Sequence, residues 1–188
     1  MGPAQQVTIQ AGKNLIPNIS TDVSGNVLTL KNKNICNWIR SYKKSVINVY
    51  ITLPRITFIT KAGTGTIQSL DTITTDTFQV RTINAGDSNL TVRAKQIEGH
   101  LFGPGDLTLS GSADNFLCNF YGGTGFMYCN NLATGYTYIS SSTTGDCYVN
   151  ANRLLIAVIN QRGNIYYTGS PPPAVMQSIN SSGKLIQE

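Results

Sequence analysis

The chain lacks long hydrophobic runs and has few charged residues. None of its apolar segments approaches the roughly 20 residues that a helix needs to span a bilayer, so no membrane-spanning helix is predicted within it. Only 12% of the 188 residues are charged, but 40% are hydrophobic, so the chain can form a core and disorder is not expected. The apolar residues show no helical periodicity, which argues against an α-helical fold.

Cysteine and histidine are too few and too scattered for a common metal or catalytic site. The four cysteines, Cys36, Cys118, Cys129 and Cys147, form no CxxC pair. The single histidine, His100, has no metal-ligand spacing to them. No serine lies in a nucleophile-elbow context. We therefore predict no zinc site and no cofactor, and a structural role for His100.

The net charge is +5, from 14 Lys and Arg against 9 Asp and Glu, and most cations are scattered. One denser group places Arg40, Lys43 and Lys44 beside Trp38 and Tyr42. Basic residues interleaved with aromatic residues can bind nucleic acid or acidic glycans. A solvated loop between two strands has the same composition and is favoured here. No nucleic-acid partner is predicted, and Trp38 stays a candidate ligand contact.

Glycine is abundant, with 18 residues, and it recurs at a nearly constant interval. Six glycines stand 18 to 20 residues apart, and each opens a short alternating strand: Gly86, Gly105, Gly125, Gly145, Gly163 and Gly183. A fixed period of this length indicates a stacked repeat architecture. Two or three short strands per repeat predict an all-β fold, a right-handed parallel β-helix or solenoid.

The repeat is clear in the C-terminal part and looser in the first eighty residues. After each glycine, the second and fourth residues are mostly apolar and should point inward, whereas the third points outward. The turn at Gly86 fits if Ser88-Asn89 is a two-residue insertion, which puts Thr91 in the outward position. We expect residues 1–14 to be a tail, or an artificial start that replaces a removed export signal. Residues 15–188 should form a single β-helix domain with a less regular N-terminal β region.

Alignment on the glycines puts three tyrosines in one outward column. Tyr128, Tyr148 and Tyr166 each stand three residues after their glycine. Adjacent strands lie about 4.8 Å apart, so the rings should stack as a ladder. Thr91 and Thr108 continue the column with smaller side chains. The strip could bind a sugar or a protein, or it could only stabilise the sheet.

A second column follows the glycines directly and contains Asp87, Asp106 and Asp146, with Phe126 as an interruption. Glycine can supply the positive φ of a corner, and Asp can cap the turn with its own side chain. Two alternatives involve chemistry. Two carboxyls about 5 Å apart suit a retaining glycosidase, and Asp87 and Asp106, the only pair on adjacent turns, could bind calcium.

Two of the cysteines, Cys129 and Cys147, are predicted to point inward on adjacent turns. Their positions after the glycines differ by two residues, which gives a diagonal of roughly 8 Å between them. That distance is beyond the reach of a disulfide. We expect buried reduced thiols that pack like small hydrophobic side chains.

Several segments resemble a known family of bacterial proteins. They are residues 25–30 (GNVLTL), 46–54 (VINVYITLP), the Gly-Asp-Leu-Thr-Leu-Ser-Gly type of repeat from Gly105, and the closing segments 163–171 (GNIYYTGSP) and 179–185 (INSSGKL). In this order they resemble the auto-transporter adhesin head domain, also called the head GIN domain, over about residues 15–186. The resemblance implies an exported β-helical protein with a role in adhesion, and it supplies no catalytic residues.

Taken with the resemblance, the repeat favours a non-enzymatic adhesion or binding module that is secreted or held at a bacterial cell surface or outer membrane. The implied partner is a glycan or another component of a host or neighbouring cell surface. Two other functions stay open. One is a polysaccharide-cleaving β-helix enzyme, and the other is a structural unit that self-associates through the tyrosine face or the solenoid ends.

Overall fold

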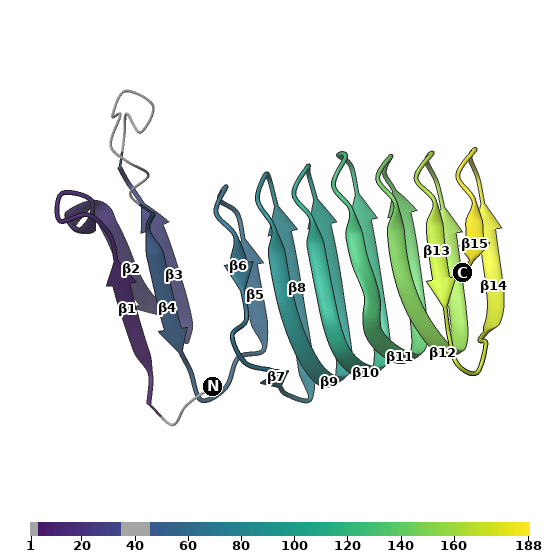
Figure 1. Ribbon diagram of the computed structural model, residues 1–188, viewed down its shortest axis with the longest axis horizontal. Helices are drawn as coiled ribbons and strands as arrows, with labels where there is room; N and C mark the ends of the chain where they lie inside the picture. Colours follow the sequence, from purple (N-terminus) through teal and green to yellow (C-terminus); the bar gives the residue numbers. More distant parts are fainter. Residues whose placement is uncertain (1–3, 35–45) are drawn as a thin grey trace. The chain divides into compact units, whose positions relative to one another are not determined.

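The computed structural model describes residues 4–34 and 46–188 (Figure 1). The candidate Trp38, Cys36 and the basic group around Lys43 lie outside the described residues. The described part is almost entirely β-structure, and its one helix is a short 3-10 helix. The chain divides into two units, Gly2–Pro54 and Arg55–Glu188.

The unit Gly2–Pro54 contains two antiparallel strand pairs. Its elements are β1 (Gln6–Gln10), which pairs with β4 (Asn48–Thr52), and β2 (Ile19–Ser24), which pairs with β3 (Val27–Asn32), with the 3-10 helix η1 (Ile16–Asn18) before β2. Gly25 and Asn26 connect β2 to β3 with positive φ angles of 54° and 63°, as a tight two-residue hairpin requires. Residues 1–14, expected to be a tail, thus include a paired strand, and the unit boundary follows Pro54.

The unit Arg55–Glu188 is the predicted parallel β-helix. Its strands pair in parallel with the equivalent strands of the neighbouring turns and form a β-solenoid of about 7 turns (Figure 1). The strands are β5 (Phe58–Lys61), β6 (Ile67–Gln68), β7 (Ile73–Thr74), β8 (Thr77–Ile83), β9 (Ser88–Phe102), β10 (Leu107–Tyr121), β11 (Met127–Ser142), β12 (Cys147–Ile159), β13 (Ile165–Thr168), β14 (Ala174–Ile179) and β15 (Leu185–Gln187). The predicted all-β solenoid is therefore confirmed.

Each central turn contains one long strand with a bend in its middle. In β9, β10 and β11 buried and exposed residues alternate along both halves, and the alternation changes phase at the bend. The halves, residues 88–94 and 96–102 in β9, therefore belong to two sheets that enclose the core between them. We call the outer surface of the first halves the first face, and that of the second halves the second face.

The strand register corrects the prediction for the turn at Gly86. Ser88-Asn89 pairs directly with Leu107-Thr108, so no insertion is present. Ser88 points inward and is fully buried. Its hydroxyl is satisfied there, because it accepts a 2.7 Å hydrogen bond from the hydroxyl of Thr82. Asn89, not Thr91, therefore precedes Thr108 in the outward column.

The recurring glycines are required because backbone lies directly against backbone between turns. A Cβ at Gly105 would lie 2.2 Å from the carbonyl oxygen of Gly86, and one at Gly145 would lie 1.8 Å from that of Gly125. Of these four glycines only Gly86 has a positive φ, 104°. Close approach, rather than the positive φ expected from the sequence, is thus the main reason for the repeat.

The buried cysteines are reduced, as the sequence predicts. Cys129 and Cys147 are fully buried and form no disulfide, and Cys118 joins them in the same core cluster. Burial raises the pKa of both Cys129 and Cys147 well above the ordinary value. The thiols therefore stay protonated, and they act as packing groups rather than as nucleophiles.

Candidate functional site

The first face carries a stack of four aromatic rings. Tyr148 stacks on Tyr128 and on Tyr166, with ring centroids 5.5 Å and 4.8 Å apart and interplanar angles of 15° and 10°. Phe126 stacks on Tyr128 at 5.9 Å. The predicted tyrosine column is present, Thr108 pairs with Tyr128 and continues it, and Phe126 extends the aromatic stack. We call these four rings the tyrosine stack.

The stacking limits which parts of the rings a ligand can reach. Because neighbouring rings cover the faces of Tyr148, this residue offers its ring edge and hydroxyl to solvent. Burial, followed by the charge of Asp146, raises the pKa of Tyr148. The phenol therefore stays protonated at neutral pH and can donate a hydrogen bond. The first face thus presents a row of tyrosine hydroxyls, one per turn.

Each aspartate of the second predicted column caps the next turn rather than its own. Oδ1 of Asp87 accepts a 3.0 Å hydrogen bond from the backbone N–H of Asp106, and Oδ1 of Asp106 accepts one of 2.8 Å from Phe126. The same contact is repeated from Asp146 to Asn164 and from Asn164 to Lys184. No group of three metal-binding side chains occurs in residues 4–34 and 46–188. The side chains of Asp87, Asp106 and Asp146 thus each have a structural role as a cap.

Replacing Asp106 with alanine is expected to lower the free energy of unfolding by about 1 kcal/mol, because the N–H of Phe126 loses its acceptor. Asp106→Asn keeps a side-chain oxygen and should recover most of this loss. Urea denaturation of the wild type and the two variants measures the effect. Equal destabilisation by both substitutions would show that the negative charge, not the cap, matters.

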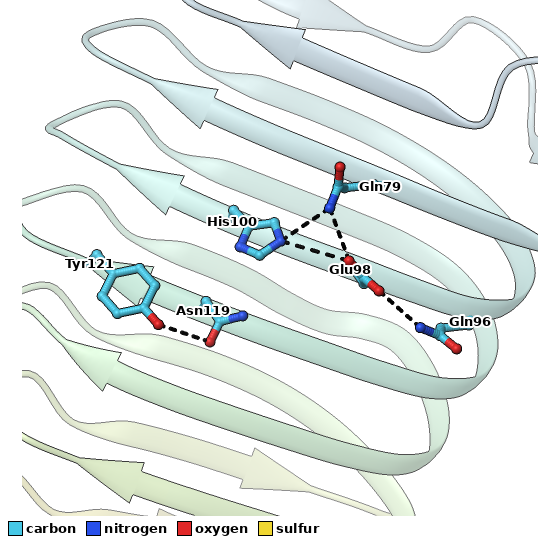
Figure 2. Close-up of polar contacts among 6 residues, drawn as sticks. All are labelled: Gln79, Gln96, Glu98, His100, Asn119 and Tyr121. Carbon is cyan, nitrogen blue, oxygen red and sulfur yellow. Dashed lines mark hydrogen bonds and ion pairs between the residues drawn. The ribbon is translucent and has the colours of Figure 1, made fainter.

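A polar cluster surrounds His100 on the second face (Figure 2). The carboxylate of Glu98 accepts hydrogen bonds from the side-chain amides of Gln79 and Gln96, both 2.9 Å long. Nε2 of His100 lies 3.5 Å from Nε2 of Gln79. Burial, and then the positive charge of Arg81, lowers the pKa of His100. A neutral, hydrogen-bonded imidazole at neutral pH agrees with the structural role predicted for it.

Acidification is expected to destabilise the folded chain through His100. Its pKa in the folded state lies below the ordinary value of 6.5, so its stabilising contribution is complete above pH 6.5. That contribution is lost as the pH falls from 6.5 through the lowered pKa, because the unfolded chain binds the proton first. The free energy of unfolding should therefore fall less steeply over this range in His100→Gln than in the wild type. Parallel slopes in urea denaturation would contradict the lowered pKa.

The second face exposes two tyrosines that the sequence did not single out. Tyr136 and Tyr138 are 45% and 41% exposed, and Thr137 between them is buried. The hydroxyls of Thr137 and Thr134 lie 2.6 Å apart, so Thr137 is satisfied inside the core. The alternating sequence shows a period of two but not its phase. Because tyrosine has the more apolar side chain, polarity alone would place the rings of Tyr136 and Tyr138 inside and Thr137 outside.

Residues 1–171 match the protein family described as "Putative auto-transporter adhesin, head GIN domain". The chain belongs to this family. The match confirms the family resemblance, and it covers the repeats and the closing segment 163–171, whereas the segment 179–185 lies beyond the matched residues. Among the described residues, no helix has the length and hydrophobicity needed to cross a membrane.

Solved structures of bacterial proteins share the fold of this head GIN domain. A "putative adhesin" from Bacteroides fragilis is 24% identical, with a TM-score of 0.87 over 98% of this chain and 83% of the other. A "putative lipid binding protein" from Parabacteroides distasonis is 17% identical, with a TM-score of 0.75 over 100% and 86%. A "putative adhesin" from the same species is 20% identical, with a TM-score of 0.69 over 100% and 86%. A search of curated protein sequences finds no match.

The family and these neighbours are described as adhesins or as a lipid-binding protein rather than as enzymes. The family description points to a surface or secreted protein that binds some surface partner. Identities below 25% show the fold alone, so the binding residues must come from the geometry of this chain.

Proposed function

We propose that this head GIN domain is a non-catalytic adhesion module that binds an extended glycan on a host or neighbouring cell surface. The observation that carries the proposal is the tyrosine stack, whose hydroxyls recur once per turn on the first face. Tyrosine combines an apolar ring with a polar tip, which suits the mixed surface of a sugar polymer.

The repetition of the stack favours a polymeric partner. Strands of successive turns lie about 4.8 Å apart, so equivalent groups meet a long ligand at regular intervals. Neighbouring rings hold one another in place, so binding costs little additional side-chain entropy. Each contact is weak, but several along one polymer add to a useful avidity.

A glycan array probed with the labelled chain tests this function. We expect binding to extended polysaccharides and weaker binding to their monosaccharide units. Sedimentation velocity on the same preparation tests whether the first face instead joins copies of the chain. An array without binding, together with concentration-dependent oligomers, would replace adhesion with self-assembly. Release of products from an acidic polysaccharide would restore the enzyme alternative.

A further inference from the structure

One column of residues at the bend of the solenoid carries charges of alternating sign. The second half of each turn is preceded by one residue of this column. In successive turns these residues are Asp76, Lys95, Asp114, Gly135 and Arg153. They lie beside one another because the residues that directly follow them are register partners in neighbouring strands. Asp76 and Lys95 form a 3.0 Å ion pair. Gly135 interrupts the alternation and leaves Asp114 and Arg153 on either side of a position without a side chain.

A hollow of about 270 Å³ lies at this interruption. Its walls include Asp114, Thr134, Gly135, Tyr136, Asn152 and Arg153. The register shifts here, so that Asn152 and Arg153 both lie opposite Gly135 in a β-bulge. Asn152 is held in place, because its amide donates to the carbonyl of Thr134 (3.1 Å) and its oxygen accepts from the N–H of Ser170 (2.8 Å).

Two charged side chains in the hollow have spare hydrogen-bonding capacity. Within the described parts of the chain, the side chain of Asp114 makes no hydrogen bond or ion pair, and Lys95 is engaged by Asp76. The guanidinium of Arg153 lies over the ring of Tyr136, 5.7 Å from its centroid, and has no carboxylate partner there. A carboxylate only accepts hydrogen bonds and a guanidinium only donates them. A matching ligand must donate at one end and accept at the other.

We propose that this hollow binds one ring of a neutral sugar through two adjacent hydroxyls, at a site separate from the tyrosine stack. One hydroxyl donates to Asp114 and the other accepts from Arg153. Two adjacent hydroxyls with a hydrogen bond at each end span roughly 8–9 Å. The backbones that carry Asp114 and Arg153 lie two strand spacings, roughly 9.6 Å, apart. The side chain of Arg153 leans back over the middle turn, because its Cδ lies 3.8 Å from the position that a Cβ would take at Gly135.

The size and charge of the hollow favour a neutral sugar over other small molecules. A volume of about 270 Å³ is below the roughly 300–1,000 Å³ of pockets for drug-sized ligands, so it suits a single small ring. Asp114 and Arg153 are both exposed, so water screens their charges and a zwitterion gains little over a neutral ligand. Hydrogen bonds to charged groups are strong for neutral hydroxyls as well.

Titration of the isotope-labelled full chain with methyl mannoside, methyl galactoside and methyl glucoside, followed by NMR, tests the site. We expect at least one of them to shift the amide signals of Gly135 and Asn152 in a saturable manner. Asp114→Ala and Arg153→Ala should each weaken that binding roughly tenfold or more, because each removes a charge-assisted hydrogen bond. Asp76→Ala and Lys95→Ala, from the same column, should leave it unchanged.

Three outcomes would overturn the proposal. The first is the absence of a saturable shift at Gly135 with all three sugars. The second is wild-type affinity in the Asp114→Ala and Arg153→Ala variants, and the third is a shift with the free amino acid glycine but not with any sugar. The joint substitution of Tyr128, Tyr148 and Tyr166 by serine should not affect this site. Failure of the hollow as a site and failure of the tyrosine stack can therefore be told apart.

Discussion

Replacing Gly145 with alanine is expected to lower the free energy of unfolding by more than about 3 kcal/mol, beyond the usual cost of overpacking. The new Cβ would lie 1.8 Å from the carbonyl oxygen of Gly125 and 3.2 Å from the ring of Phe120. Because the nearer atom belongs to the backbone, the two turns would have to move apart. Domains are stable by only about 5–15 kcal/mol, so a large part of the chain should unfold in mild urea.

The matched control is Gly63→Ala. A Cβ at Gly63 meets nothing within 4 Å, and its φ is ordinary. This substitution should change the stability by no more than about 0.5 kcal/mol. Circular dichroism during urea and thermal denaturation measures both variants. If Gly145→Ala is tolerated as well as Gly63→Ala, the steric explanation of the glycine repeat is wrong.

Replacing Tyr128, Tyr148 and Tyr166 with serine together is expected to weaken glycan binding at least roughly a hundredfold. Truncating a central aromatic residue of a binding surface typically costs about 2 kcal/mol or more, although such losses are not additive. The two lost tyrosine–tyrosine stacks should also reduce stability by about 1–3 kcal/mol. The core should remain intact, because the three side chains project from the outer face. Affinity measurement by calorimetry, with circular dichroism as a check of the fold, tests this result.

Two further variants identify what the rings supply. Substitution of the same three tyrosines by phenylalanine keeps the stack and removes the hydroxyls, so binding should fall if the hydroxyl row makes the contact. Tyr121→Ser with Tyr138→Ser removes two exposed rings from the second face and should leave binding unchanged. Unchanged affinity in the serine triple variant would remove the tyrosine stack as a site.

The period in the sequence was enough to predict the parallel stack and its tyrosine column. In a solenoid of parallel strands, residues at equal distances from their glycines become neighbours, and Tyr148 and Tyr166 did so. The same rule holds at Ser88, which pairs with Leu107, so the two-residue insertion expected there was wrong. The buried partner of Ser88 is Thr82, and the sequence gives no sign that these two hydroxyls meet.

Other features depend on contacts between turns that no single repeat contains. The aspartates were predicted to cap their own turns, but Asp106 caps the turn of Phe126. Tyr136 points outward because its strand places Thr137, and not Tyr136, on the core side. There Thr137 forms a buried hydrogen bond with Thr134. The hollow at Gly135 likewise needs the bulge at Asn152, a difference in length between neighbouring turns.

NMR mapping of the glycan that binds best on the array tests the adhesion proposal most directly. If the tyrosine stack is the binding surface, the glycan should shift ring and backbone signals of Tyr128, Tyr148 and Tyr166 and of their outward neighbours on the first face. Signals of Tyr121 and Tyr138 on the second face should stay unchanged. Shifts confined to the second face, with none at the three stacked tyrosines, would contradict the proposed mode of adhesion.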